Sequence, residues 1–332
     1  MPAYQVLREK ETTPTFRESF ARDILISLSE SPKRIPSRYF YDAEGSRLFQ
    51  QIMELPEYYL TGCEFEIFRN SKEQIADFLA MQGRCNLIEL GPGDGRKTRI
   101  LIEHFLKASL DFEYVPIDIS ESAMEELIPD LRSSFPRLQF RPIVSEYFNA
   151  LHWLKNLNSS RNFVLFLGSN IANFNAQASR VFLRSLWNAL NADDYVLIGF
   201  DLKKDIDLLL RAYNDSQGVT TRFNLNLLTR INRELGGNFD IRKFRHFGTY
   251  NVFSGAMESY LVSLERQSVS IQEIGQSFSF EPWEPIHTEY SYKYLESDIL
   301  KLAEETGFVP VRQFYDSRGF FTDCIWRVQK SA

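Results

Sequence analysis

The chain is poor in cysteine and histidine. Its 332 residues include 3 cysteines and 4 histidines. The cysteines Cys63, Cys85 and Cys324 lie far apart and form no Cys-x-x-Cys pair, and the histidines are isolated. We therefore expect no zinc site or other metal centre, and no disulfide framework.

Long apolar runs and basic stripes are also missing. No segment offers the ~20 apolar residues of a membrane span, and the N-terminus lacks the apolar core of a signal peptide. The 38 Lys and Arg are outnumbered by 44 Asp and Glu, which gives a net charge of −6. We expect a cytoplasmic location and no membrane or nucleic-acid partner. A monomer is compatible with the sequence, which leaves the oligomeric state open.

A glycine-rich turn is the most informative feature that is present. The apolar run Leu87 to Leu90 ends in Gly91, Gly93 and Gly95, and a helical pattern follows at once. Glycine takes positive φ without a Cβ penalty and lets the backbone approach a bulky ligand. The stretch therefore predicts a strand, a binding turn and a helix start.

An acidic residue ends the next apolar run. Tyr114 to Ile117 is followed by Asp118, at the tip of the second predicted strand, where a carboxylate can bind ribose hydroxyls. Glu89 precedes the first glycine, and the glycine spacing is Gly-x-Gly-x-Gly. These details favour S-adenosylmethionine over a dinucleotide as the cofactor.

Strand and helix patterns alternate through the middle of the chain. Strands without clean polar alternation suit a parallel sheet covered on both faces. The expected strands are Cys85–Leu90, Tyr114–Asp118, Leu138–Val144, Phe163–Gly168 and Tyr195–Asp201. The expected helices between them are Lys97–Lys107, Glu121–Phe135 and Gln177–Leu190.

A different pattern interrupts this series. Residues 203–287 combine a long helix, Thr220 to Leu235, with alternating segments typical of antiparallel strands. The chain closes with a predicted hairpin, Val309–Tyr315 and Phe320–Val328. We expect four parts: a helical segment (1–60) that joins the substrate domain, a Rossmann-like cofactor domain (61–202), an inserted substrate domain (203–287) and a return to the sheet (288–332).

Polar residues near the predicted strand ends are candidates for cofactor contacts. Lys97 could contact the cofactor carboxylate or be an exposed residue of the first helical turn. Glu146 could reach the adenine amino group while Tyr147 packs on the ring, or both could be ordinary strand-end packing. Asn170 and Asn173 follow the fourth strand and offer amide groups, and a simple Asn-capped turn is the alternative.

Clustered tyrosines and one alternating segment are candidates for substrate contacts. Tyr41 and Tyr58 lie in tyrosine clusters of the N-terminal segment, where core packing is the alternative. Glu289 and Ser291 would face the same side of an extended segment. Together they could grip a heterocyclic N–H group, or they could belong to a solvated strand edge.

Several motifs together are similar to one family. The chain resembles the histidine-specific N-alpha-methyltransferases of ergothioneine biosynthesis from about Pro32 to the C-terminus. The motifs are Pro32-Lys33, Tyr39-Phe40-Tyr41-Asp42, Gly45-Ser46-x-Leu48-Phe49, Leu55-Pro56-Glu57-Tyr58-Tyr59, Glu89-Leu90-Gly91-x-Gly93, Phe166-Leu167-Gly168-Ser169-x-Ile171, Asp201-Leu202, Ala212-Tyr213-x-Asp215-x-x-Gly218-Val219-Thr220, Asn232-Arg233-Glu234-Leu235 and Thr288-Glu289-x-Ser291-x-Lys293.

The resemblance implies a fold and a set of site residues. The fold is a Rossmann-like class I methyltransferase, with a mostly parallel seven-stranded sheet and a terminal antiparallel hairpin, plus a smaller α+β domain that completes the amino-acid pocket. The implied cofactor contacts are Glu89, Gly91, Gly93, Lys97, Asp118, Glu146 and Tyr147. The implied substrate contacts are Tyr58, Asn173, Tyr213, Glu289 and Ser291.

The roles of these residues also follow from the resemblance. Asn173 and Tyr213 would hold the carboxylate of the amino acid, and Glu289 and Ser291 would read the imidazole. Tyr41, as the catalytic residue, would lie near the amine. The implied reaction is transfer of methyl groups from S-adenosylmethionine to the α-amine of L-histidine, three times in succession, to give hercynine.

Two departures from the family pattern leave the substrate less certain than the reaction. Ala172 replaces a glycine, and Ser259 takes the place of a pocket methionine, which could widen the side-chain pocket. Methylation of another amino acid such as tryptophan is therefore an alternative. A binding protein without catalysis is a second alternative, and the intact glycine turn and Asp118 disfavour it.

Overall fold

The chain folds into two compact units. The computed structural model describes residues 4–7, 15–81, 83–154 and 161–330. Unit 1 comprises Met1–Glu9, Leu60–Lys203 and Lys293–Ala332, and unit 2 comprises Lys10–Tyr59 and Lys204–Tyr292. Each unit has its own hydrophobic core.

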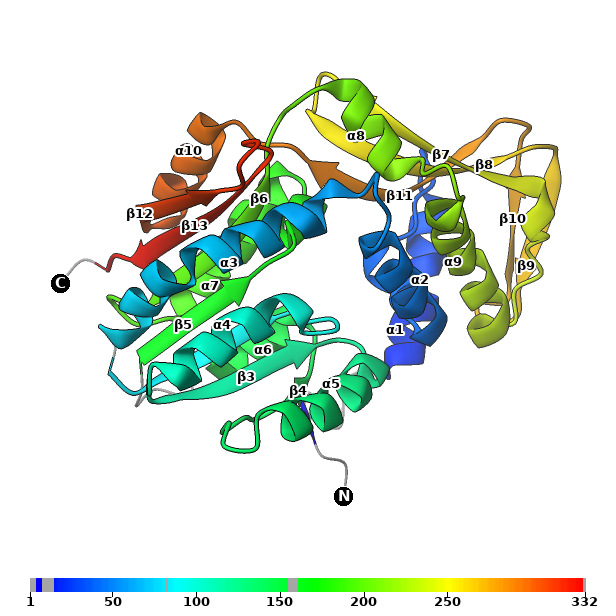
Figure 1. The fold of residues 1–332 in the computed structure, drawn as a ribbon. Helices are drawn as coiled ribbons and strands as arrows, with labels where there is room; N and C mark the ends of the chain where they lie inside the picture. Colours follow the sequence, from blue (N-terminus) through cyan, green and yellow to red (C-terminus); the bar gives the residue numbers. More distant parts are fainter. Residues whose placement is uncertain (1–3, 8–14, 82, 155–160, 331–332) are drawn as a thin grey trace. The chain divides into compact units, whose positions relative to one another are not determined.

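Unit 1 is built on one large sheet (Figure 1). Among the described residues its strand order is β1-β4-β3-β2-β5-β6-β13-β12. All neighbours from β1 to β6 are parallel, and β13 runs antiparallel to both β6 and β12. The strands are β1 (Gln5–Val6), β2 (Cys85–Leu90), β3 (Phe112–Asp118), β4 (Ile143–Val144), β5 (Arg161–Phe166), β6 (Tyr195–Asp201), β12 (Phe308–Tyr315) and β13 (Phe321–Val328).

This topology confirms the predicted α/β class with a terminal antiparallel hairpin. The sheet has eight strands in the described residues rather than the predicted seven. The additional strand is β1, which pairs with β4 at the sheet edge through only two residues. Such a short segment carries no periodic pattern that a sequence reading could detect.

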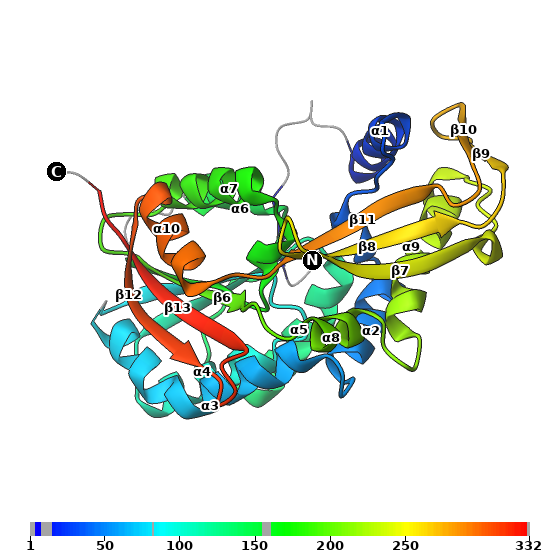
Figure 2. The same cartoon turned by 90° about the horizontal axis from the view of Figure 1, so that it is seen from above.

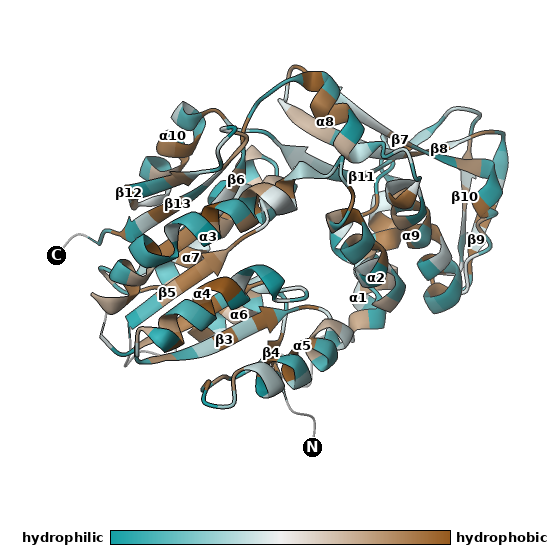
Figure 3. Cartoon of the chain, viewed as in Figure 1, coloured by the Kyte–Doolittle hydropathy of each residue, from teal (hydrophilic) through white to brown (hydrophobic). Residues whose placement is uncertain are grey.

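Helices cover both faces of this sheet. Figure 2 shows α3 and α4 on one side and α6, α7 and α10 on the other. Figure 3 shows alternating hydrophobic and hydrophilic segments along α3 and α4, typical of helices with one buried face. The helices are α3 (Tyr59–Ala80), α4 (Arg96–Lys107), α5 (Glu121–Ser134), α6 (Tyr147–Leu154), α7 (Ala176–Ala189) and α10 (Glu296–Thr306).

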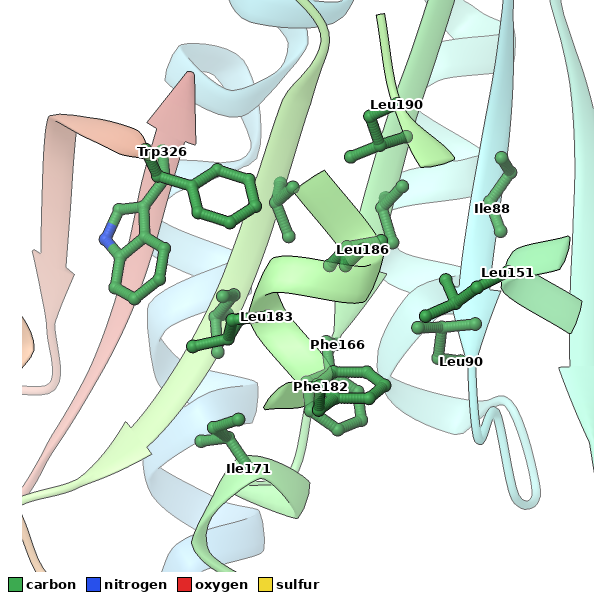
Figure 4. Packing of buried hydrophobic residues seen from close by; sticks show 14 of the residues in the cluster. Ile88, Leu90, Leu151, Phe166, Ile171, Phe182, Leu183, Leu186, Leu190 and Trp326 are labelled. Carbon is green, nitrogen blue, oxygen red and sulfur yellow. The ribbon is translucent and has the colours of Figure 1, made fainter. Parts of the chain in front are cut away.

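The core of unit 1 lies between the sheet and α7 (Figure 4). The rings of Phe166 on β5 and Phe182 on α7 lie with their centroids 4.9 Å apart. Leu183 and Leu186 continue the buried face of the helix, and Trp326 of β13 packs into the same core. Full burial of such side chains contributes roughly 1.5–3 kcal/mol each, which holds the strand ends in fixed positions.

The strand predicted over Leu138–Val144 is mostly absent. Only Ile143–Val144 forms β4, and Phe140 makes an isolated bridge to Tyr114. Pro142 has no N–H to donate, so a continuous ladder across it is not possible.

Unit 2 combines helices with two small antiparallel sheets. Its three-stranded sheet has the order β11-β8-β7, and β10 pairs with β9. The strands are β7 (Phe244–Asn251), β8 (Ala256–Ser263), β9 (Gln267–Ile271), β10 (Gln276–Phe280) and β11 (Pro285–Tyr292). The helices are α1 (Phe16–Ser29), α2 (Ala43–Met53), α8 (Ile206–Tyr213) and α9 (Val219–Leu235). Strand β11 thus continues to Tyr292, beyond the boundary predicted at residue 287.

A buried histidine on β7 makes unit 2 sensitive to acid. Burial lowers the pKa of His246 to about 4, although Asp215 opposes the shift, and its Nε2 atom has no hydrogen-bond partner among the described residues. The unfolded chain takes up a proton below pH ~6.5 and the native chain does not, so stability falls from there towards pH ~4. We predict that wild type loses about 2–3 kcal/mol more than His246→Gln between pH ~7 and pH ~4.5, measured by urea unfolding. The exposed His152, changed to Gln, is the control, and equal losses in wild type and His246→Gln would contradict the prediction.

Two kinds of feature are absent from the described ranges. None of their helices is both long and apolar enough to cross a membrane. Within the same ranges, no three His, Cys, Asp or Glu side chains gather in a way that could hold a metal ion.

Candidate active site

The glycine turn of unit 1 connects β2 to α4. Gly91, Gly93 and Gly95 all have positive φ, of 75°, 56° and 67°. A Cβ at Gly91 would lie 2.7 Å from the Tyr147 hydroxyl and 3.2 Å from Nδ2 of Asn170, so only glycine fits there without a shift. The structure thereby brings together three segments that the sequence analysis had singled out separately.

Asp118 lies beside this turn at the end of β3. Its Oδ1 accepts a hydrogen bond from the Ser120 N–H at 2.9 Å, and its Oδ2 lies 3.4 Å from the Gly93 N–H. Burial raises the pKa of Asp118, while the backbone N–H groups of Ser120 and Gly93 oppose the rise. Backbone glycines and a fixed carboxylate at the carboxyl ends of parallel strands fit the ribose of a nucleoside cofactor.

Glu89 is buried beneath the turn. It accepts hydrogen bonds from the Thr98 hydroxyl, at 2.5 Å, and from the Tyr114 hydroxyl. Burial raises the pKa of Glu89 to about 7, against the effect of these two donors. The carboxyl group therefore ties β2, β3 and α4 together, and its direct contact with a cofactor remains a prediction.

The other cofactor candidates surround the same turn. Lys97, in the first turn of α4, forms an ion pair with Glu64 of α3. The Tyr147 ring packs against Phe166 at a centroid distance of 5.5 Å, so it is fixed where α6 begins. Glu146 immediately precedes it. Contacts of these residues with the cofactor remain predictions.

Replacing Asp118 should weaken cofactor binding. A charge-assisted hydrogen bond contributes about 1.5–3 kcal/mol, so we expect Asp118→Ala to raise the Kd for S-adenosylhomocysteine by about 10- to 100-fold. Calorimetric titration measures this Kd directly. Asp118→Asn keeps an acceptor for Ser120 and should bind with intermediate affinity, and a wild-type Kd in the alanine variant would remove Asp118 from the site.

Candidate substrate residues gather in unit 2. The hydroxyls of Tyr213 on α8 and Ser291 on β11 lie 2.7 Å apart and share a hydrogen bond. The Tyr58 ring contacts the Tyr213 ring edge-on at a centroid distance of 6.3 Å. Residues from three separate stretches of sequence therefore lie in one cluster.

Tyr41 joins the same cluster through Phe49. The Phe49 ring lies 5.8 Å from Tyr41 and 6.3 Å from Tyr58, between centroids, and Phe223 of α9 packs behind it. In the sequence, Phe49 belongs to one of the motifs of the family resemblance, and Phe223 carries no signal of a site. The one local signal for Phe49 is its helical spacing to Ile52, which predicts packing rather than a site.

Glu289 lies on the same strand as Ser291, two residues earlier. It is paired across the ladder with Ser259, while Ser291 is paired with Met257, and the β-bulge lies before Glu289 rather than between the two residues. The two side chains therefore face the same side of the sheet, as predicted. Asn173, by contrast, belongs to unit 1, in a 3₁₀ helix over Asn170–Asn173.

A buried carboxylate fixes the backbone next to Tyr41. Asp42 caps α2 by accepting the Gly45 N–H at 2.7 Å, and it also accepts hydrogen bonds from Asn226 and Arg233 of α9 at 2.8 and 2.6 Å. Burial would raise the pKa of Asp42, but the Arg233 and Gly45 hydrogen bonds outweigh it and lower the pKa. The backbone next to Tyr41 is therefore held in a fixed position.

The fold and the glycine turn define a class I methyltransferase. The family model described as "Histidine-specific methyltransferase, SAM-dependent" matches residues 20–328. The chain belongs to this family, and it is an S-adenosylmethionine-dependent methyltransferase.

Three relatives align with most of the chain. The histidine N-alpha-methyltransferase of Mycolicibacterium smegmatis is 33% identical over 92% of this chain and 93% of its own length. That of Mycobacterium tuberculosis is 32% identical over 90% of this chain and 92% of its own length. The ergothioneine biosynthesis protein 1 of Schizosaccharomyces pombe is 31% identical over 87% of this chain but only 38% of its own length.

Proposed function

We propose that this protein methylates the α-amino group of L-histidine, three times in succession, to give hercynine in ergothioneine biosynthesis. One structural observation supports this substrate most directly. Glu289 and Ser291 lie on one face of β11, and Ser291 is hydrogen-bonded to Tyr213 within an aromatic cluster. A carboxylate and a hydroxyl on one face match the two ring nitrogens of an imidazole.

The aromatic cluster suits a substrate whose amine changes with each round. Tyr58, Phe49 and Tyr41 offer ring faces, and the two tyrosines also offer hydroxyls. Ring faces tolerate an amine that gains methyl groups and positive charge. Recognition of the imidazole by Glu289 and Ser291 does not depend on amine N–H groups. Such contacts would retain a partly methylated substrate through three rounds.

The chain's contribution to catalysis is alignment and desolvation. S-adenosylmethionine, when bound, supplies a methyl group on a positively charged sulfur, already activated for displacement. Gly91, Gly93 and Asp118 would hold the cofactor at the strand ends, and Tyr213 would hold the carboxylate of the amino acid. Holding two reactants in line converts a bimolecular step into an effectively unimolecular one.

The amine must be neutral to attack. No histidine side chain is among the candidate site residues, so we propose that the Tyr41 hydroxyl orients the amine and that solvent water takes its proton. Because the reaction uses two small water-soluble metabolites, we further propose that it takes place in the cytoplasm.

Steady-state kinetics on substrate analogues test this proposal. We expect the highest kcat/KM for L-histidine, a large loss for histamine, which lacks the carboxylate, and little turnover of L-tryptophan. Tryptophan is the informative competitor because Ser259, only 2% exposed, is paired with Glu289 where a larger residue would narrow the pocket. A higher kcat/KM for tryptophan than for histidine would replace the proposed substrate but keep the reaction.

A further inference from the structure

A buried group of charged side chains lies in unit 1 where α3 and α4 cover the sheet. Glu64 of α3 and Asp323 of β13 are both 0% exposed. Glu64 accepts the Gly168 N–H at 2.7 Å through Oε1 and forms an ion pair with Lys97 through Oε2. The cofactor site as described above does not account for Glu64 or Asp323.

The surrounding backbone leaves room for this group. Gly199 of β6 is the ladder partner of Asp323, and a Cβ there would lie 2.7 Å from Oε1 of Glu64 and 2.9 Å from the Phe321 ring. Any residue other than glycine would force the Glu64 carboxylate to move. The absence of a side chain at Gly199 thus lets the carboxylate reach the turn after β5.

Asp323 lacks an ordinary hydrogen-bond donor. Among the described residues no N–H or O–H group donates a hydrogen bond to either of its carboxyl oxygens. Asp323 is paired across the ladder with Gly199, so its side chain points to the face of the sheet on which Oε1 of Glu64 lies. Two buried carboxylates side by side repel one another unless one carries a proton. Glu64 already receives the Lys97 ammonium and the Gly168 N–H, so the proton belongs on Asp323.

We propose that Glu64 is a positioning residue that holds Lys97 and the Gly168 turn in place for cofactor binding, and that Asp323 is a neutral, protonated acid whose O–H group donates a hydrogen bond to the Glu64 carboxylate. The part concerning binding rests on the proposed contact of Lys97 with the cofactor. A Cβ at Gly168 would lie 3.1 Å from Lys97 Nζ, so the ammonium group sits directly beside this turn.

The electrostatics of the group agree with this arrangement. Burial raises the pKa of Asp323 well above its usual range, the Glu64 carboxylate raises it further, and Lys97 opposes the rise. Burial alone would lower the pKa of Lys97, but Glu64 outweighs it, with help from Glu89 and Asp323, and the pKa is raised. Cys324 follows Asp323 on β13, and burial raises its pKa to about 12, so its thiol stays neutral.

The shared proton is tested by the pH dependence of unfolding, without cofactor. Native Asp323 keeps a proton that the unfolded chain releases above pH ~4, so this residue costs stability as the pH rises. Asp323→Asn mimics the protonated acid and removes that cost. From about pH 5 to about pH 8 we expect the Tm of the variant, relative to wild type, to rise by about 3 °C or more. An unchanged Tm difference would mean that Asp323 is ionised, and would overturn the shared proton.

Glu64→Gln tests the same proton from the other partner. The amide that this variant introduces can donate a hydrogen bond to an ionised Asp323 carboxylate, so Asp323 no longer needs a proton. The Tm of the variant, relative to wild type, should therefore rise with pH as it does for Asp323→Asn. Adding Asp323→Asn to it should then bring no further pH-dependent gain. If the double variant showed the full additional rise in Tm, the two substitutions would act independently, and the proposed hydrogen bond between Asp323 and Glu64 would be wrong.

The positioning role is tested by calorimetric titration with S-adenosylhomocysteine, well below the Tm of each variant. We expect Glu64→Gln to raise the Kd about tenfold, and the exposed Glu73→Gln on the same helix to leave it unchanged. In a Lys97→Met background the Glu64 change should have no further effect. If Lys97→Met raised the Kd while Glu64→Gln kept the wild-type value, Glu64 would have no role in cofactor binding, and the positioning role would be wrong. A wild-type Kd for Lys97→Met would instead refute the contact between Lys97 and the cofactor, and the proton test would stand by itself.

Discussion

Replacing Glu289 with alanine lowers kcat/KM for L-histidine by about 100- to 1,000-fold. Removing the carboxylate eliminates an ionic hydrogen bond to a substrate N–H group. It also leaves that N–H group buried without an acceptor, which costs additional free energy. The Kd for S-adenosylhomocysteine should stay within about twofold of wild type, because the proposed cofactor contacts are the glycine turn and Asp118 and do not include Glu289. Initial rates with both substrates varied measure the first effect, and calorimetry the second.

Two matched variants on the same strand sharpen this prediction. Glu289→Gln keeps the shape but not the charge and should recover part of the activity. Tyr290→Phe changes the residue between Glu289 and Ser291, which faces the opposite side of the sheet and packs on His287. It should leave kcat/KM within about twofold of wild type. Wild-type turnover of histidine by Glu289→Ala would refute the proposed reading of the imidazole.

Breaking the buried ion pair between Lys293 and Asp201 destabilises the protein by about 3–5 kcal/mol. Lys293 Nζ lies 2.8 Å from Asp201 Oδ2, and both side chains are 0% exposed. Lys293→Met leaves the carboxylate in a dry interior without its counter-charge, which is the costly state. Both residues come from motifs quoted in the sequence analysis, Asp201-Leu202 and Thr288-Glu289-x-Ser291-x-Lys293, which gave no hint that they pair.

Urea unfolding followed by circular dichroism measures this cost. The double variant Lys293→Met with Asp201→Leu removes both charges and should be more stable than Lys293→Met alone. Lys203→Met provides a control with a more exposed lysine, whose ion pair with Asp298 is 3.9 Å long and should contribute little. A loss below about 1 kcal/mol for Lys293→Met would show that the buried charge is compensated in another way.

Local patterns predicted the parts of the fold that depend on neighbours in sequence. The six residues of Cys85–Leu90 are all buried and form β2 with the predicted bounds. Tyr195–Asp201 is likewise β6 as predicted. Both are apolar runs bounded by turn residues, and such runs are typical of strands buried on both faces of a parallel sheet. Asp118 at the end of β3 follows from the same logic.

Features that depend on distant residues were not predictable in this way. Helix α6 was missed because Tyr147–Leu154 is short and apolar on most sides. The contact of Phe49 with both Tyr41 and Tyr58, and the pairing of Glu64 with Lys97, join segments whose distance only the fold sets. Most candidate site residues follow from the family resemblance, while the residues that contact them are evident only in the structure.

Mass spectrometry of the products tests the central claim most directly. The purified protein is incubated with S-adenosylmethionine and an equimolar mixture of the twenty amino acids. We predict methylated histidine as the dominant product, progressing through the mono- and dimethyl forms to the trimethyl form. Dominant methylation of another amino acid, or no methylated amino acid despite bound cofactor, would contradict the proposed function.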